Sequence, residues 1–260
     1  MRILVTFAID AEFSGWRSRH PFVPYEFDDS GRKRDFDLFK ANISFAEVTV
    51  LLTGMGRKST IASLKSVPCE IYDLCISTGL AGALDPSLKI KEIVVCRAAE
   101  TQDQSAQAGS DPLLFGVAVS CGAKSVETFL TSEALVSTAG EKLLLQPLAS
   151  VVEMETAHVM AAAAQAGVPA VGVRVIGDIA QEDLPLDFTQ VTDVRGHVKF
   201  GPLLKELAFH PHKLPLLVRF GSQSRSAVQS LADFLDAFLP LVVFKFSKVR
   251  PNMKEEVAAT

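Results

Sequence analysis

The sequence predicts an α/β fold, in which a sheet is covered by helices on its faces. Short apolar runs of strand length alternate along the chain with stretches that have helical spacing. Several of these runs are continuously apolar, which is typical of strands buried on both faces of a parallel sheet. No internal repeat or low-complexity linker interrupts the 260 residues, so a single domain is expected over residues 1–245.

The expected strands follow one another through the first two thirds of the chain. Residues 2–9 (RILVTFAI) are the first of them. The others are residues 48–52, 71–77, 90–96, 113–120, 150–154 and 170–176. In such a sheet the active site gathers at the carboxyl ends of the strands, so the polar residues that follow each strand are the candidates for function.

Helices are expected between the strands and towards the end of the chain. Apolar residues with helical spacing precede Pro68, residues 155–165 are rich in alanine, and residues 203–209 form a short helical pattern. Ser222 is expected to cap a final amphipathic helix whose apolar stripe packs on the core. That stripe consists of Ala227, Val228, Leu231, Phe234, Leu235 and Phe238.

Two segments fall outside this alternation of strands and helices. Residues 14–42 are polar, charged and aromatic, and we expect a surface excursion that is either a lid or an oligomer contact. Residues 246–260 are expected to be a flexible tail because they carry little apolar content.

The composition excludes several classes of protein. The formal net charge of −4 leaves no basic surplus for a nucleic-acid binder. The longest candidate for a membrane span, residues 237–244, is far shorter than the roughly 20 residues that a spanning helix needs. No signal-peptide cleavage site follows the N-terminus, and four cysteines without a CxxC pair predict reduced thiols. We therefore expect a cytoplasmic protein without a membrane span.

Metal ligands are not signalled by the spacing of the histidines. Glu155 and His158 share one helix face, but a di-metal bundle needs a second such pair. His210 and His212 flank a proline on an extended segment without other ligands nearby in the sequence. No metal or other cofactor is expected.

Three carboxylates follow predicted strands and are the first candidates for chemistry. Glu12 comes after the first strand, Glu155 after the strand at 150–154, and Asp178 after the strand at 170–176. Carboxylates in one crevice can divide the work of acid and base if their surroundings separate their pKa values. The alternative interpretation is that Glu12 and Glu155 open helices, where acidic residues are favoured, and that Asp178 begins a turn.

Four motifs, in order along the chain, resemble those of the purine nucleoside phosphorylase/nucleosidase superfamily. VEMETA at residues 152–157 followed by VRVIGD at 173–178 resembles its VDMEs/t-A … R-x-I-S-D signature. RILVTFAIDAE at the N-terminus resembles the first strand of the methylthioadenosine/S-adenosylhomocysteine nucleosidases. STGLAGAL at residues 77–84 resembles their glycine-rich turn, and ETFL at 127–130 their base-stacking strand.

The resemblance implies a fold, a reaction and a role for each matched residue. The fold would be a three-layer α/β/α arrangement around a central mixed, largely parallel sheet, and relatives form homodimers. The reaction would be cleavage of the N-glycosidic bond of a purine-type ribonucleoside with a modified 5′ position. Asp178 would protonate the leaving base and Glu12 would activate water. The implied substrate-binding residues are Glu155, Met154, Phe129, Leu130, Thr78 and Gly79.

Two parts of the sequence depart from the motifs of the nucleosidases. Gly177 stands where the family usually has a serine that orients the aspartate, so Asp178 would depend on another partner. The C-terminal third, including residues 183–188, is more similar to hopanoid-associated members of the superfamily. This second similarity keeps a bulky apolar 5′-substituent open.

The nucleophile is water or phosphate, and charge favours water. Phosphorylases of the superfamily bind phosphate through arginines, but the corresponding positions hold residues 10–12 (DAE) and 77–78 (ST) here. Arg17, Arg19 and Arg57 remain possible phosphate ligands. One alternative is therefore a nucleoside phosphorylase. The other is a non-catalytic nucleoside-binding protein, in which Gly177 and the altered C-terminal third have removed the activity.

Overall fold

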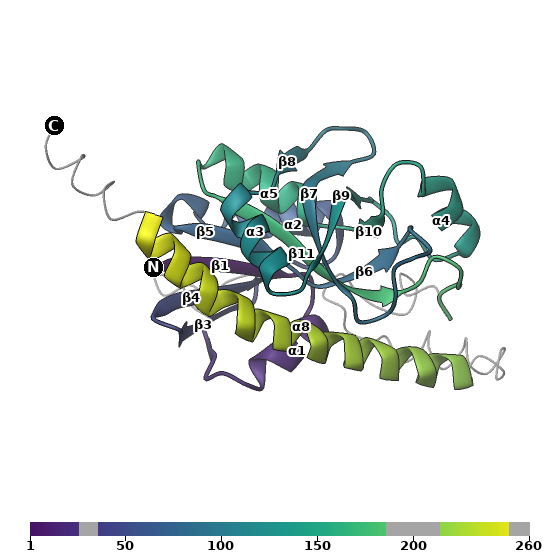
Figure 1. Ribbon diagram of the computed structural model, residues 1–260, viewed down its shortest axis with the longest axis horizontal. Helices are drawn as coiled ribbons and strands as arrows, with labels where there is room; N and C mark the ends of the chain where they lie inside the picture. Colours follow the sequence, from purple (N-terminus) through teal and green to yellow (C-terminus); the bar gives the residue numbers. More distant parts are fainter. Residues whose placement is uncertain (26–35, 186–213, 250–260) are drawn as a thin grey trace, which may run out of the picture.

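The computed structural model describes residues 1–25, 36–185 and 214–249, and within them it contains a mixed, 11-stranded sheet (Figure 1). The strand order is β2-β3-β4-β1-β5-β11-β6-β10-β9-β7-β8. The strands are β1 (Arg2–Phe7), β2 (Val23–Pro24), β3 (Leu38–Ile43), β4 (Ala46–Leu52), β5 (Leu74–Ser77), β6 (Leu80–Ala83), β7 (Ile93–Thr101), β8 (Gln107–Gly109), β9 (Lys124–Thr131), β10 (Val151–Glu153) and β11 (Ala170–Asp178). The strands at the centre run parallel, from β4 through β1 and β5 to β11 and on to β6.

Strand β11 joins the two parts of the sheet. Residues 170–172 pair in parallel with β5, and residues 175–178 pair with β6. Its other edge pairs with β7, and β7, β9, β10 and β6 pair in turn, so the pairings close into a ring that returns to β11. The second half of β11 therefore lies between β6 and β7, inside this ring of strands.

Helices cover both faces of this sheet, and the predicted three-layer architecture is confirmed. They are α1 (Asp10–Arg17), α2 (Gly56–Lys65), the 3-10 turn η1 (Cys69–Ile71), α3 (Pro112–Ser120), α4 (Ala139–Leu145), α5 (Thr156–Gln165) and α8 (Leu214–Val249). One apolar cluster joins α1, α3 and α8 to the sheet, and a second joins α2 and α5 to it. Figure 1 shows α8 lying along α1 on one face of the molecule.

Six of the seven expected strands are confirmed, with ends shifted by a few residues, but the expected strand at 113–120 is wrong. These residues form α3 instead. The Asp111 carboxylate caps the helix by accepting hydrogen bonds from the N–H groups of Leu113 (2.9 Å) and Leu114 (3.0 Å), and Pro112 occupies the first turn. A continuous apolar run does not distinguish a buried strand from a buried helix, and this cap decided the outcome.

The final helix is longer than predicted. α8 begins at Leu214, so Ser222 lies inside the helix rather than capping it, and the helix continues to Val249, into the segment expected to be a flexible tail. All six residues of the predicted apolar stripe are buried. By length and composition α8 could cross a membrane, whereas the longest span expected from the sequence was residues 237–244. This is weak evidence for a membrane span, because half of the most apolar window of α8 is buried inside the fold.

The segment 14–42 is only partly a surface excursion. Its first residues finish α1, and Trp16 is buried there with its indole N–H donating to Asp236 of α8 at 2.8 Å. Its last residues, from Leu38, belong to β3. Residues 26–35, the predicted helix at 203–209, residues 186–188, His210, His212 and residues 250–260 lie outside the described residues.

Candidate active site

Glu12 is held in one orientation between the ends of two strands. It lies in the first turn of α1, directly after β1, and only 7% of its surface is exposed. Its Oε2 accepts a hydrogen bond from the N–H of Ala8 (3.0 Å) and its Oε1 from the N–H of Leu80 (2.8 Å). Burial raises the pKa of Glu12, against the opposing charge of Arg174 and the backbone N–H groups. A carboxylate with a raised pKa is a stronger base than usual near neutral pH.

Arg174 of β11 lies at the centre of a cluster of carboxylates. Its Nη2 donates to Glu153 Oε2 (2.5 Å) and Thr156 Oγ1 (2.9 Å), and lies 3.7 Å from Glu155 Oε2. The side chain is fully buried, and within the described residues its Nη1 has no hydrogen-bond partner. Buried polar groups in proteins are normally satisfied, so an unpaired guanidinium N–H beside Glu12 points to a ligand or a water at this place.

Glu153 and Glu155 are separated by one residue but have pKa values shifted in opposite directions. Burial favours the neutral form of Glu153, but Arg174 and the Thr131 hydroxyl outweigh it and lower its pKa. Burial raises the pKa of Glu155 to about 8, despite Arg174 and the hydrogen bond to Glu155 Oε1 from the N–H of Gly56 (3.0 Å). The single guanidinium thus compensates Glu153, and Glu155 holds a proton at neutral pH and can both donate and accept.

The proton on Glu155 is expected to make stability depend on pH. Between the usual value of 4.5 and the raised pKa of about 8, the folded protein holds this proton and the unfolded chain does not. The free energy of unfolding therefore falls as pH rises through this range, by up to about 1.4 kcal/mol per pH unit. Glu155→Gln removes this dependence and leaves an amide oxygen for the N–H of Gly56. We expect the variant to lose less stability than the wild type between about pH 5 and pH 8 in urea unfolding; equal losses would contradict the raised pKa.

Gly79 lies between Glu12 and Arg174 and leaves no room for a side chain. Its φ is +144°, and a Cβ built there would lie 2.6 Å from Arg174 Nη1 and 2.8 Å from Glu12 Oε2. Both the backbone conformation and the close approach therefore require glycine. The N–H that binds Glu12 belongs to the next residue, so this turn fixes the carboxylate.

Gly79→Ala is expected to lower both stability and activity. The clash and the backbone strain together should cost at least about 2 kcal/mol in unfolding free energy, and displacement of Glu12 should lower turnover by more than about tenfold. Gly122→Ala is the matched control, because Gly122 also has a positive φ (+96°) but a Cβ there meets nothing within 4 Å. The control should lose stability alone; equal activity losses in the two variants would contradict the argument.

Asp178 ends β11 and faces a buried lysine. Its Oδ2 lies 2.5 Å from Nζ of Lys142, which comes from α4 and has no exposed side-chain surface. A fifth of the Asp178 side chain is exposed, into a cavity of about 390 Å³ between residues 181–185 and the first turns of α8. Burial raises the pKa of Asp178, and the charge of Lys142 opposes that shift. Lys142 was not anticipated from the sequence.

Asp178 and Glu12 flank the same short strand. The N–H of Leu80 binds Glu12, and Gly82, two residues further along β6, is in contact with Asp178: a Cβ on Gly82 would lie 3.0 Å from Asp178 Oδ2. On the other side of β6, Gly82 pairs with Val152 of β10. Met154 and Glu155 come directly after β10 in the chain, so they lie near this pair. The carboxyl groups of Glu12 and Asp178 therefore lie near the same end of β6, two residues apart along that strand.

Of the other predicted site residues, Met154 and Thr78 offer groups that a ligand could contact, whereas Leu130 and Phe129 are buried. Met154 is half-buried over the Gly56 turn, and the Thr78 hydroxyl is buried without a partner among the described residues. Leu130 is buried at the end of β9. The ring of Phe129 lies in the apolar core with no exposed surface, so in this conformation it has no face open to a ligand.

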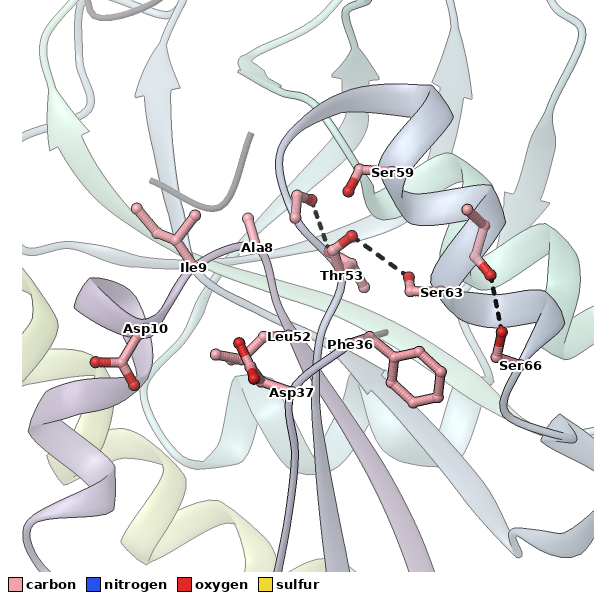
Figure 2. A pocket seen from close by; sticks show the side chains of 12 residues that line it. Ala8, Ile9, Asp10, Phe36, Asp37, Leu52, Thr53, Ser59, Ser63 and Ser66 are labelled. Carbon is pink, nitrogen blue, oxygen red and sulfur yellow. Dashed lines mark hydrogen bonds between the residues drawn. The ribbon is translucent and has the colours of Figure 1, made fainter. Parts of the chain in front are cut away.

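A second cavity, of about 260 Å³, opens where β1 and β4 end beside α2. Figure 2 shows the carboxylates of Asp10 and Asp37 at one side of it and the hydroxyls of Thr53, Ser59 and Ser63 at the other. None of the predicted site residues lines this cavity. It adjoins the site through Ala8, whose N–H binds Glu12.

The three arginines considered as phosphate ligands are each engaged by carboxylates. Arg17 pairs with Asp10 at 2.5 Å. Arg19 pairs with Asp233 and Asp236 of α8, at 2.6 and 3.1 Å. Arg57 pairs with Glu133 (2.7 Å) and lies 3.6 Å from Asp103. These three arginines do not form a phosphate-binding cluster.

Comparison with known proteins agrees with the sequence motifs. A family profile described as the Phosphorylase superfamily matches residues 98–199. The 5′-methylthioadenosine/S-adenosyl homocysteine nucleosidase of Campylobacter jejuni has the same fold, with 14% identity, a TM-score of 0.70, and coverage of 92% of this chain and 99% of that chain.

Two further solved structures share the fold. S-adenosylhomocysteine nucleosidase from Streptococcus pyogenes, in complex with 5-methylthiotubericidin, is 17% identical at a TM-score of 0.69, covering 92% of this chain and 96% of that one. Futalosine hydrolase of Helicobacter pylori is 19% identical at a TM-score of 0.68, covering 92% and 97%. The profile match over residues 98–199 and the shared fold agree with the resemblance found in the motifs: this part of the chain is similar to the phosphorylase superfamily, and the described fold is that of the nucleosidases.

Proposed function

We propose that this protein is a nucleosidase that hydrolyses the N-glycosidic bond of a purine-type ribonucleoside with a modified 5′ position. The observation that carries the proposal is the environment of Glu12. Its carboxylate is oriented by two backbone N–H groups beside an unpaired guanidinium N–H of Arg174. A water between these groups would be held by a base and a donor together.

Hydrolysis of this bond passes through a ribosyl cation with oxocarbenium character, as in glycoside hydrolysis generally. The base leaves with the electrons of the C1′–N9 bond, and protonation at its N7 makes it a better leaving group. Asp178 supplies this proton, because burial raises its pKa above the ordinary value of an aspartate. Glu12 then takes a proton from the water that attacks C1′.

Glu155 and Met154 would bind the ribose. At neutral pH Glu155 is protonated, so it can accept a hydrogen bond from one ribose hydroxyl and donate to another. Met154 offers an apolar surface next to it, half-buried above the Gly56 turn. Phe129 is left out of this arrangement, because its ring is enclosed in the core. The base would approach Asp178 from the cavity at the end of β11.

Water is favoured over phosphate as the nucleophile. Glu12 and the other carboxylates around Arg174 would repel a phosphate dianion, and Arg17, Arg19 and Arg57 are paired with carboxylates. The proposal is tested by measuring base release from 5′-substituted adenosines, inosines and futalosine-like nucleosides, with and without phosphate. Free ribose product without phosphate supports a hydrolase. Ribose 1-phosphate formed only with phosphate would identify a phosphorylase, and binding without turnover a nucleoside-binding protein.

A further inference from the structure

Lys142 is a fully buried lysine that lies beside Asp178, the proposed general acid. Its side chain has no exposed surface, and a buried ammonium is stable only when paired and hydrogen-bonded. Its Nζ lies 2.5 Å from Asp178 Oδ2 and donates to the carbonyl oxygens of Ile179 (2.8 Å) and Glu182 (2.9 Å). Two hydrogen bonds to backbone carbonyls and an ion pair with Asp178, all within residues 178–182, therefore fix the ammonium in position.

The residue before Asp178 has no side chain that could hold the Asp178 carboxyl group in place. Position 177 is glycine, and a Cβ there would lie 3.1 Å from the Leu80 side chain. A serine hydroxyl at this position would have to be accommodated against Leu80. The partner that the sequence requires for Asp178 is thus supplied by α4.

We propose that Lys142 is the positioning residue of the general acid, an inference that rests on the nucleosidase proposed above. It holds Asp178 Oδ2, so that the proton is carried on Oδ1 and directed to the base. As the C1′–N9 bond breaks, its electron pair goes to the base and the Oδ1 proton moves to N7. The carboxylate that remains on Asp178 is then neutralised by the ammonium of Lys142.

Other charged groups near Asp178 are already paired. Arg219 of α8 binds Glu182 at 2.8 Å, and Asp183 accepts a hydrogen bond from the N–H of Ala139 at the start of α4. These groups line the same cavity as Asp178. Lys142 is the one titratable group among the described residues whose charge acts appreciably on the Asp178 carboxyl. A change in the titration of Asp178 after substitution of Lys142 is therefore attributable to this pair.

A purely structural role for Lys142 would also involve its two bonds to carbonyl groups, which tie residues 179–182 to α4. Two variants separate the roles. Lys142→Met removes the charge and all three donors, whereas Lys142→Gln removes the charge and keeps an amide donor for the carbonyls. Lys124→Met is the control for loss of a lysine, because Lys124 is half-exposed and its nearest carboxylate, on Glu92, is 3.9 Å away.

The experiment measures pH profiles of kcat and KM, together with carbon-13 NMR titration of the Asp178 carboxyl in the whole protein. In both Lys142 variants we expect kcat to fall by about 10- to 100-fold, with KM changed less than about threefold. Because the ammonium lowers the pKa of Asp178, its removal should move the alkaline limb of the kcat profile and the NMR titration to higher pH. Lys124→Met should change none of these.

The outcomes distinguish this inference from the proposed function. Variants that lose stability but keep kcat and the alkaline limb would overturn the positioning role and leave a structural one. If the wild type itself releases no base, the nucleosidase proposal fails. The NMR titration then still decides on the pair: a higher pKa of Asp178 in Lys142→Gln supports control by Lys142, and an unchanged one overturns it.

Discussion

Asp178→Asn is expected to abolish base release while leaving nucleoside binding in place. Asparagine has nearly the same shape as aspartate but carries no acidic proton, so the base would have to leave without protonation at N7. Loss of a positioned general acid typically lowers turnover by about 10²- to 10⁴-fold. The amide oxygen can still accept from Lys142, so the fold around residues 178–182 should persist. Turnover and the dissociation constant of a nucleoside are measured on the same preparation.

Asp73→Asn provides the matched control for this substitution. Asp73 lies directly before β5, at the opposite end of the strand from the site, and accepts a hydrogen bond from the N–H of Arg2 (2.7 Å), which an amide oxygen can also accept. Its turnover should stay within about threefold of the wild type. Undiminished activity of Asp178→Asn would remove Asp178 from the mechanism, and loss of binding as well as turnover would assign it to substrate recognition.

The sequence predicted the carboxylates of the site because each stands where a strand ends. Glu12 and Asp178 follow β1 and the body of β11, which run in the same direction through β5 and therefore end at one edge of the sheet. Glu155 follows β10, which runs antiparallel to β6, so the parallel-strand argument does not explain its position; it lies 3.7 Å from Arg174 because the strands close into a ring. Arg174 was present in the matched motif but was assigned no role. Its signal is the charge within the buried run AVGVRVIGD, because an arginine enclosed in a sheet must find carboxylates.

Lys142 could not be found in the same way. The stretch GEKLLL reads as an ordinary amphipathic helix, in which a lysine is normally solvated. Its partner Asp178 comes from another element, and the loop that follows Asp178 encloses the ammonium. Burial of this kind depends on how two distant segments pack, and no periodicity within either segment records it. The glycine at position 177, where relatives usually have a serine, indicated only that Asp178 needs another hydrogen-bonding or charged partner.

The C-terminal helix shows where local signals mislead. Ser222 was the expected start of the helix, but the helix begins at Leu214 and runs through it, so packing on α1 and the sheet overrides the local preference. The buried face from Ala227 onward was correctly predicted, because apolar residues that recur at helical spacing lie on one side of a helix and pack on the core. Periodicity thus predicted the faces of helices better than their ends.

Glu12→Gln is expected to remove the base that activates water, and turnover should fall by about 10²- to 10⁴-fold. Both carboxylate oxygens of Glu12 already accept a backbone N–H, one from Ala8 and one from Leu80. An amide therefore turns its NH₂ towards one of these donors, and this conflict should cost about 1–3 kcal/mol in unfolding free energy. Thermal unfolding must accompany the kinetics, so that loss of folded protein is separated from loss of chemistry.

The pH profile distinguishes a base from a residue that merely shapes the site. Because Glu12 must be ionised to take the proton of water, wild-type kcat/KM should fall as pH drops through its raised pKa. In Glu12→Gln this acid limb should disappear from the residual activity. Glu47→Gln is the control, a half-exposed carboxylate at the opposite end of the parallel strands, and should behave as the wild type. Persistence of the acid limb in Glu12→Gln would transfer the role of the base to another carboxylate of the Arg174 cluster, with Glu155 the first to be substituted.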